Sequence, residues 1–330
     1  MTLPPAPRAG SMDARTEDTM ATTYTLKHRA ATIRRRLYRD LVFRRSLYGY
    51  LFVLPALAFF VLFSIYPTFN GFYLSLTEYS LLKPPRWIGL ENYTALLHDA
   101  LFLQALGVTA VFVVGAVVPK SILSLALGLV FVRPFSGREV FKTLYFTPTL
   151  LLGVVISLVW KLLLDPAGLV NVVASPFTGG ERFFWLTSPT LSPAAIIGID
   201  NWAGIPFFMI IWIAGLVGIP REFYEASLID GASQLQAFFH ITLPLLKPTA
   251  LFVLVISSIG AFQAFTLQYV LTRGGPNNHT TTIALLVYKY GFNYYRMGSA
   301  AAISIVMFAF IIALTLIQIR WVRSEETSYL

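Results

Sequence analysis

The polar side chains best placed to do chemistry lie inside two of the most apolar stretches of the chain. Lys120 lies within the stretch 105–132, and Asp200 and Asn201 lie within the stretch 194–216. A charged side chain at the centre of a bilayer costs about 2.5 to 3.5 kcal/mol on insertion scales, so such residues are functional candidates by default. We expect Lys120 and Asp200 to face the protein interior, as a pair beside a solute pathway. A structural salt bridge, or a lysine that points into a wet cavity, is the alternative.

Two glutamines in the stretch 250–271 offer a second kind of polar chemistry. Gln263 and Gln268 lie among the aromatic residues Phe262, Phe265 and Tyr269. Amide groups can hydrogen-bond to sugar hydroxyls, and aromatic rings can pack against the face of a sugar ring, so the combination suits a carbohydrate. Glutamine also forms hydrogen bonds between membrane helices, and this structural interpretation stays open.

Several other kinds of chemistry are excluded by composition and spacing. The chain has no cysteine, and its four histidines are scattered without the spacing of a metal site. It contains no glycine-rich phosphate loop followed by Lys and Ser or Thr, the usual means of holding ATP. We therefore expect no catalytic residue, no metal and no cofactor in this chain.

The composition indicates a polytopic membrane protein. Of the 330 residues, 56% are hydrophobic and only 12% are charged, whereas a soluble domain carries roughly a quarter. A membrane helix needs about 20 apolar residues. The sequence therefore predicts an all-α fold with six transmembrane helices, at 47–69, 105–132, 143–164, 194–216, 250–271 and 297–319. The second predicted span contains Pro119, and we count it as one span because a proline kink is tolerated inside a membrane helix.

Basic residues are distributed unevenly over the loops between these spans. The N-terminal tail, the loops 133–142 and 218–249, and the C-terminal tail 320–330 together hold 17 Lys and Arg, against 5 in the opposite loops. Because positive charge collects on the cytoplasmic side, both termini are expected there. The basic tail 1–46, partly disordered, is typical of a flank beside membrane lipid rather than of a nucleic-acid-binding arm. The span region between the tails covers 47–319.

The loop 218–249 is a polar island between two apolar spans. Pro220 suits a helix start, and Asp230-Gly231 ends that helix with a residue free to take positive φ. Ser233 with Gln236 three residues later is a capping-box pattern for a second helix, which Pro244 and Pro248 are expected to stop. The island is therefore expected to form two short helices on the cytoplasmic side. An amphipathic interfacial loop without a partner is the alternative.

The island also resembles a known family signature. The EAA loop of ABC importer permeases has the same spacing as Glu225-Ala226-Ser227, Gly231, Ile241 and Leu243-Pro244, with Ser227 in place of the second alanine. The segments 141–171 and 269–278 are similar to those of the carbohydrate-uptake branch, of the maltose and glycerol-phosphate type. The resemblance extends over most of the chain from about Leu47.

This resemblance implies a division of labour among several subunits. It implies a permease of a prokaryotic inner membrane that imports a sugar, polyol or sugar phosphate. A cytoplasmic ATPase dimer docks on the EAA loop, a second permease completes the pathway, and an extracytoplasmic binding protein delivers the solute. The coupling role then belongs to Glu225, Ala226, Ser227, Asp230 and Gly231. A heterodimer of permeases is expected in this branch, and a homodimer stays open.

Two other functions compete with the importer. An ion-coupled secondary transporter would be expected to have two similar halves and several intramembrane acids, yet only Asp200 is available. A polytopic membrane enzyme would need clustered His, Asp or Glu near one membrane face, and the sequence shows no such cluster.

Overall fold

The computed structural model describes residues 49–324; the predicted tail 1–46 lies outside the described residues, as do residues 325–330 of the C-terminal tail. The chain divides into two compact units, Met1–Phe69 and Asn70–Leu330. One helix, Gly49–Ser75, holds the described residues of the first unit and continues into the second. It includes the π-helical turn η1 (Val61–Ile65) and ends as α2 (Tyr66–Ser75).

Short elements follow at the start of the second unit. Strands β1 (Thr77–Ser80) and β2 (Lys83–Trp87) form an antiparallel hairpin, and α3 (Glu91–Leu97) comes next. The hairpin is the only sheet in residues 49–324, and it is too short to span a bilayer. The fold is otherwise helical, as the composition predicts.

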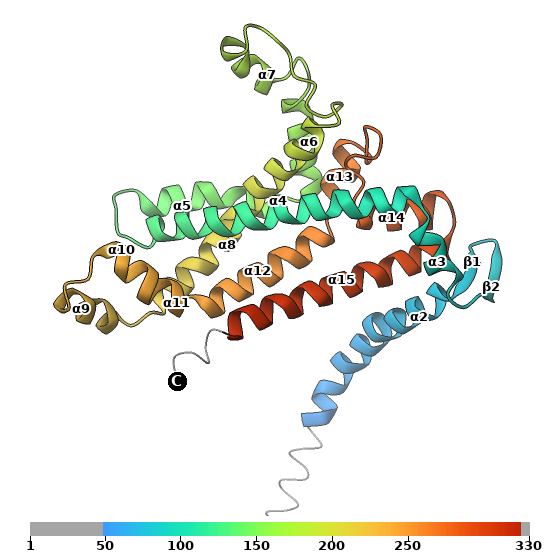
Figure 1. Cartoon of the computed structure of the whole chain (residues 1–330), viewed down its shortest axis with the longest axis horizontal. Helices are drawn as coiled ribbons and strands as arrows, with labels where there is room; N and C mark the ends of the chain where they lie inside the picture. Colours follow the sequence, from blue (N-terminus) through green and yellow to red (C-terminus); the bar gives the residue numbers. More distant parts are fainter. Residues whose placement is uncertain (1–48, 325–330) are drawn as a thin grey trace, which may run out of the picture. The chain divides into compact units, whose positions relative to one another are not determined.

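Four long helices form the body of the second unit and pack side by side (Figure 1). They are α4 (Ala100–Phe131), α8 (Leu191–Val217), α12 (Lys247–Phe262) and α15 (Met297–Ser324). Small residues allow the close approach, as is usual between membrane helices. A Cβ added to Gly128 of α4 would lie 3.0 Å from the Trp212 Cβ of α8, so a larger residue there would push the two helices apart.

Shorter helices connect these four. Between α4 and α8 lie α5 (Arg138–Phe146), η2 (Thr147–Leu150), α6 (Gly153–Leu163), α7 (Leu169–Ala174) and η3 (Ser175–Phe177). Between α8 and α12 lie α9 (Arg221–Ile229), α10 (Gln234–Ala237), η4 (Phe238–Thr242) and α11 (Leu243–Leu245). Before α15 come α13 (Thr266–Leu271), α14 (Ile283–Tyr288) and η5 (Lys289–Asn293). Two of the π-helical turns, η4 and η5, thus lie in connecting segments, whereas η1 lies within the helix Gly49–Ser75.

Five helices of the described chain are long and apolar enough to cross a membrane, and they coincide with five of the six predicted spans. Their bounds are Gly49–Ser75, Ala100–Phe131, Leu191–Val217, Lys247–Leu271 and Met297–Val322. The second runs unbroken past Pro119, as expected.

The predicted third span, 143–164, is not one straight helix. The segments Arg138–Leu150 and Gly153–Leu163 meet at an angle of 99°, and only together would they count as a sixth span. Pro148 cannot donate a backbone hydrogen bond, and Leu152 is extended with ψ at 138°, so the helix stops and restarts. Apolar composition alone did not indicate this bend.

The predicted fifth span is also interrupted, at residues 263–265. Gln263 ends α12, and Phe265, with φ at −131°, precedes α13. Thr282 Oγ1 donates a 2.7 Å hydrogen bond to the Ala264 carbonyl and so satisfies a group that the interruption frees. The Gly153 position of α6 faces Thr266 of α13, so the two broken segments meet.

Candidate functional site

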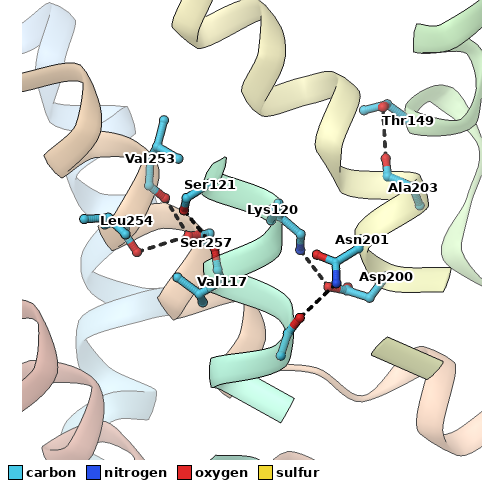
Figure 2. A network of polar contacts seen from close by, with 11 residues as sticks. Val117, Lys120, Ser121, Thr149, Asp200, Asn201, Ala203, Val253, Leu254 and Ser257 are labelled. Carbon is cyan, nitrogen blue, oxygen red and sulfur yellow. Dashed lines mark hydrogen bonds and ion pairs between the residues drawn. The ribbon is translucent and has the colours of Figure 1, made fainter. Parts of the chain in front are cut away.

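An ion pair joins α4 and α8 in the interior of the second unit. Lys120 Nζ lies 2.6 Å from Asp200 Oδ2, and the two side chains are 7% and 26% exposed. Figure 2 shows Lys120 reaching from α4 to the neighbouring helix that carries Asp200 and Asn201. The structure therefore pairs Lys120 of one predicted span with Asp200 of another.

The surroundings of this pair are adapted to the lysine. A Cβ on Gly204 would lie 2.9 Å from Lys120 Cε, so glycine makes room for the side chain. The ammonium also lies 5.9 Å from the centre of the Phe208 ring, within cation–π range. Asn201 Nδ2 donates a 2.9 Å hydrogen bond to the Gly115 carbonyl of α4. The same turn of α8 thus holds α4 through both a charge and an amide.

The Asn201 amide is only half satisfied. Its Oδ1 is buried and accepts no hydrogen bond from any of residues 49–324. A buried acceptor without a donor costs about 1–3 kcal/mol, so a water or another hydrogen-bond donor is expected there. The ion pair and Asn201 therefore form a polar centre with unused capacity.

The two glutamines predicted to face a solute together do not share a face. Gln263 is exposed at the end of α12, in the interruption of the fifth span. Gln268 on α13 is fully buried, and neither of its amide atoms has a partner in the described chain. Within residues 49–324, no hydrogen bond joins either glutamine to Lys120 or Asp200.

Gln268 lines a mainly apolar cavity of about 350 Å³. The cavity lies among α4, α8, α13 and the loop 272–282, and its other polar lining residues are Gln104, His279, Thr280 and Thr282. A space of this size could hold several waters. Water there would satisfy the Gln268 amide.

The polar island forms as its sequence predicts at the α9 end. Asp230 caps α9, and Gly231 takes φ at +75°. The amide of Gly231 donates to the Leu228 carbonyl, and the amide of Ala232 donates to the Ser227 carbonyl. This pair of bonds is a Schellman motif, which satisfies the last carbonyls of the helix. The turn between α9 and α10 is therefore fixed by hydrogen bonds, and not only by the freedom of glycine.

The predicted capping box of the second helix is also present. Ser233 Oγ accepts from the Gln236 amide, and the Ser233 amide donates to Gln236 Oε1 at 2.8 Å. The expectation that Pro244 and Pro248 stop this helix is wrong. The chain continues through η4 into α11, and each proline lies in the first turn of a new helix, where its missing N–H costs little.

The island residues differ in which way they face. Glu225, Ala226, Asp230 and Gly231 are exposed. Ser227 is buried, and its hydroxyl donates to the Tyr224 carbonyl, so it faces the chain's own helices and not a partner. The small residue at this position therefore packs against the chain's own helices.

Exposed apolar side chains on the island were missed by the sequence patterns. Leu228, Ile229 and Leu235 are all largely exposed, and Ile229 is 86% exposed. The helical periodicity could have predicted them. Ser227 is buried and marks the inward face of α9, and Ile229 lies about 200° around the helix from Ser227, on the outward face. Clustered exposed apolar residues indicate a protein contact.

The inward face of the island is tied to the long helices. The Tyr224 hydroxyl lies 2.9 Å from Thr242 Oγ1, which joins α9 to η4. The Tyr224 ring packs against a buried cluster from α8, α12 and the intervening loops, including Trp212, Leu216 and Leu246. Trp212 in turn donates a 3.0 Å hydrogen bond to Ser124 of α4. A force on α9 would therefore reach α4, α8 and α12 directly.

No metal centre accompanies these features in the described chain. Within residues 49–324, no group of three or more His, Cys, Asp or Glu side chains lies close enough to hold a metal ion.

Comparison with known proteins identifies similar chains. Residues 30–324 match the family model described as "Binding-protein-dependent transport system inner membrane component". The trehalose/maltose transport system permease protein MalF of Thermococcus litoralis is 34% identical over 289 residues, which are 86% of this chain and 96% of that protein. The probable ABC transporter permease protein YesP of Bacillus subtilis is 32% identical over 289 residues, covering 85% and 93%.

A solved structure shares the fold. It is a bacterial alginate ABC transporter in complex with an alginate pentasaccharide-bound periplasmic protein, with a TM-score of 0.74 and 23% identity. The match covers 86% of this chain and 96% of that chain.

Proposed function

Because the chain belongs to the family of binding-protein-dependent transport system inner membrane components, we propose that it is the permease subunit of an ABC importer for a sugar or a related polyol or sugar phosphate. Permeases of this family form the pore, while a separate ATPase hydrolyses ATP. The similarity to a trehalose/maltose permease supports a carbohydrate as solute. Family membership favours this function over the ion-coupled secondary transporter.

The observation that carries the mechanism is the exposed island α9–α10. Its Schellman turn and capping box fix two short helices, and its exposed apolar residues suit a cleft on a partner. The ATPase dimer is the proposed partner. The exposed carboxylates Glu225 and Asp230 would meet basic or backbone donors at the rim of that cleft.

Coupling would proceed by movement of rigid helices. Closure of the ATPase dimer would displace α9, and the Tyr224–Thr242 contact would carry the displacement to η4 and α12. The cluster around Trp212 would carry it to α8 and α4. The energy for transport then comes from the partner. This chain supplies two arrangements of its helices, and each makes different contacts with the ATPase and the solute.

The polar centre on α4 and α8 is the proposed place along the pathway where the solute meets charge. Lys120 and Asp200 neutralise each other, and Asn201 Oδ1 can accept a hydrogen bond from a solute hydroxyl or a water. The exposed amide of Gln263 is a second candidate contact. The buried Gln268 would act through water in its cavity.

The remaining partners follow from the same assignment. An extracytoplasmic binding protein delivers the solute, consistent with the family description and with the periplasmic protein bound to the alginate transporter. A second permease chain completes the pathway, because this chain carries one EAA loop and an importer needs two. A different chain in that role is the expectation for this branch, and a second copy of this chain is the alternative. The excess of basic residues in the terminal tails and in the loops 133–142 and 218–249 supports the proposal that both termini and the island lie in the cytoplasm.

Uptake by a reconstituted transporter tests the function directly. The chain would be placed in vesicles with its second permease, ATPase and binding protein, and given radiolabelled maltose, trehalose and glycerol 3-phosphate in turn. ATP-dependent accumulation of at least one of them is expected. Accumulation driven by a proton or sodium gradient without ATP would contradict the proposal.

A further inference from the structure

Four aromatic rings form a continuous cluster on α13, α14 and η5, which we name the aromatic ladder. Its members are Phe265, Tyr269, Tyr288 and Phe292. Phe265 and Tyr269 are stacked with 14° between their planes and 5.2 Å between their centres. Tyr288 contacts both of them, at 5.3 and 5.2 Å. Phe292 extends the row from Tyr288 at 5.3 Å.

The ladder is built from two segments that are distant in sequence and locked together in space. Thr282, the N-cap residue of α14, donates a hydrogen bond to the carbonyl of Ala264, which precedes Phe265 in the chain. The turn η5 has the wider π-helical geometry, which occurs frequently at functional sites. Tyr288 and Phe292 lie four residues apart along this continuous helical path, so both rings project on the same side. This hydrogen bond and the ring contacts therefore hold the two segments against each other.

The ladder presents an aromatic surface to its surroundings. Phe292 is 59% exposed and Tyr269 is also exposed, while Phe265 and Tyr288 are half-buried. These elements lie at the end of the second unit opposite to the island α9–α10 (Figure 1). With the island in the cytoplasm, the ladder lies at the extracytoplasmic end.

Hydrogen-bonding groups border these rings. Gln263 stands two residues before Phe265, in the interruption of the fifth span, and its side chain is exposed. Tyr269 and Tyr288, whose rings contact each other, each add a phenol hydroxyl. Aromatic rings edged by an amide and hydroxyls match the two surfaces of a pyranose, whose C–H face is apolar and whose edge carries hydroxyls.

We propose that the aromatic ladder is a stacking platform for sugar rings at the extracytoplasmic mouth of the pathway, with Gln263 at its inner border. This inference rests on the proposed function and names a site for its substrate class. A row of several similar rings offers a sugar successive weak positions rather than one tight one. Such a row would accept a ring from the binding protein and guide it inwards past Gln263.

A matched pair of substitutions separates this role from others. Phe292→Leu removes one ring of the ladder, and Phe310→Leu removes an exposed ring from α15. Phe292→Trp keeps an aromatic surface. Each variant would be reconstituted with the second permease, ATPase and binding protein. The readouts are initial uptake of radiolabelled maltose and trehalose at saturating binding protein, ATPase rate, and recovery of the second permease.

The ladder predicts that Phe292→Leu lowers the uptake rate of the transported sugar about two- to tenfold, the value of one aromatic contact. The uptake rate of Phe292→Trp should stay within about twofold of the wild-type rate. The uptake rate of Phe310→Leu should equal the wild-type rate. Recovery of the second permease should be unchanged throughout.

Other outcomes overturn the inference. Wild-type uptake by Phe292→Leu would remove the ladder from the pathway, as would an equal loss in Phe310→Leu. Loss of the second permease from Phe292→Leu would make the ladder a contact between permeases. Failure of wild type to import either sugar, with glycerol 3-phosphate imported, would refute the ladder and leave the importer function standing. Failure with all three probes would contradict the function itself.

Discussion

Lys120 of α4 and Asp200 of α8 form a 2.6 Å ion pair, with the lysine side chain almost wholly buried. Removing one partner of a buried pair leaves a charge without compensation, which costs about 3–5 kcal/mol. We therefore expect Lys120→Met to lower the thermal stability of the purified chain strongly. Asp200→Asn should do the same, as measured by unfolding in detergent.

The double variant Lys120→Met with Asp200→Leu separates stability from transport. Replacing a buried pair with apolar residues is often neutral or stabilising, so this variant should regain most of the lost stability. If the pair contacts the solute, uptake should stay low in the double variant although its stability returns. Full uptake by the double variant would reduce the pair to a structural salt bridge, and unchanged stability in Lys120→Met would contradict the buried pairing.

Gly231 gives the island its bend, because its φ of +75° is unfavourable for residues with a Cβ. Gly231→Val should therefore distort the α9–α10 turn and reduce copurification of the ATPase. Gly179 is the matched control, since it also has positive φ, at +65°, and also has open space around it. Gly179→Val lies outside the island and should leave ATPase recovery unchanged. Equal recovery from both variants would sink the docking role of the turn.

Ser233 starts α10 through both bonds of its capping box. Loss of such a cap costs about 0.5–2 kcal/mol, so Ser233→Ala should increase hydrogen exchange of the first amides of α10. Ser233→Asp should restore protection, because aspartate is an equally good cap. Unchanged exchange in Ser233→Ala would show that tertiary contacts alone hold the helix.

Tyr290 of η5 donates a hydrogen bond to Asp99 Oδ2, and Asp99 also caps α4. Burial first, and this hydrogen bond second, raise the pKa of the Tyr290 phenol above its ordinary value of 10. A group with a raised folded pKa contributes stability that is complete below its ordinary pKa and is lost as the pH rises through the folded value.

Tyr290→Phe should therefore lower the melting temperature at pH 8, because the lost hydrogen bond contributes about 1 kcal/mol to the free energy of unfolding. The difference in melting temperature between the variant and wild type should narrow above about pH 10, because wild type then loses the stability that the Tyr290 phenol contributes. Tyr294→Phe, at the exposed neighbouring tyrosine, is the control and should leave the melting profile unchanged. A constant difference up to pH 11 would contradict the assignment.

Local features of the island could be predicted from sequence, because caps and turns depend on residues a few positions apart. The capping box of Ser233 and the positive φ of Gly231 are of this kind. The pairing of Lys120 with Asp200 could be expected because a bilayer leaves isolated charges few places to go. The burial of Ser227 could not, since it depends on how α9 rests on the long helices.

The two interrupted spans were beyond the sequence patterns for the same reason. The interruption at 263–265 is stabilised by Thr282, a residue almost twenty positions away, and the bend before Gly153 packs against Thr266. Hydropathy records how apolar a stretch is and not whether its helix is continuous. The aromatic ladder likewise joins two segments whose proximity only the fold reveals.

The central claim, that the island is the surface on which the ATPase docks, can be tested with single cysteines. The natural chain has none, so an introduced cysteine is its only thiol. Ile229→Cys lies on α9 and Leu82→Cys on the β1–β2 hairpin, at residues 86% and 91% exposed. With a thiol-to-amine cross-linker in the assembled transporter, the account predicts a covalent product with the ATPase from Ile229→Cys and none from Leu82→Cys. An ATPase product from Leu82→Cys, or none from Ile229→Cys, would contradict it.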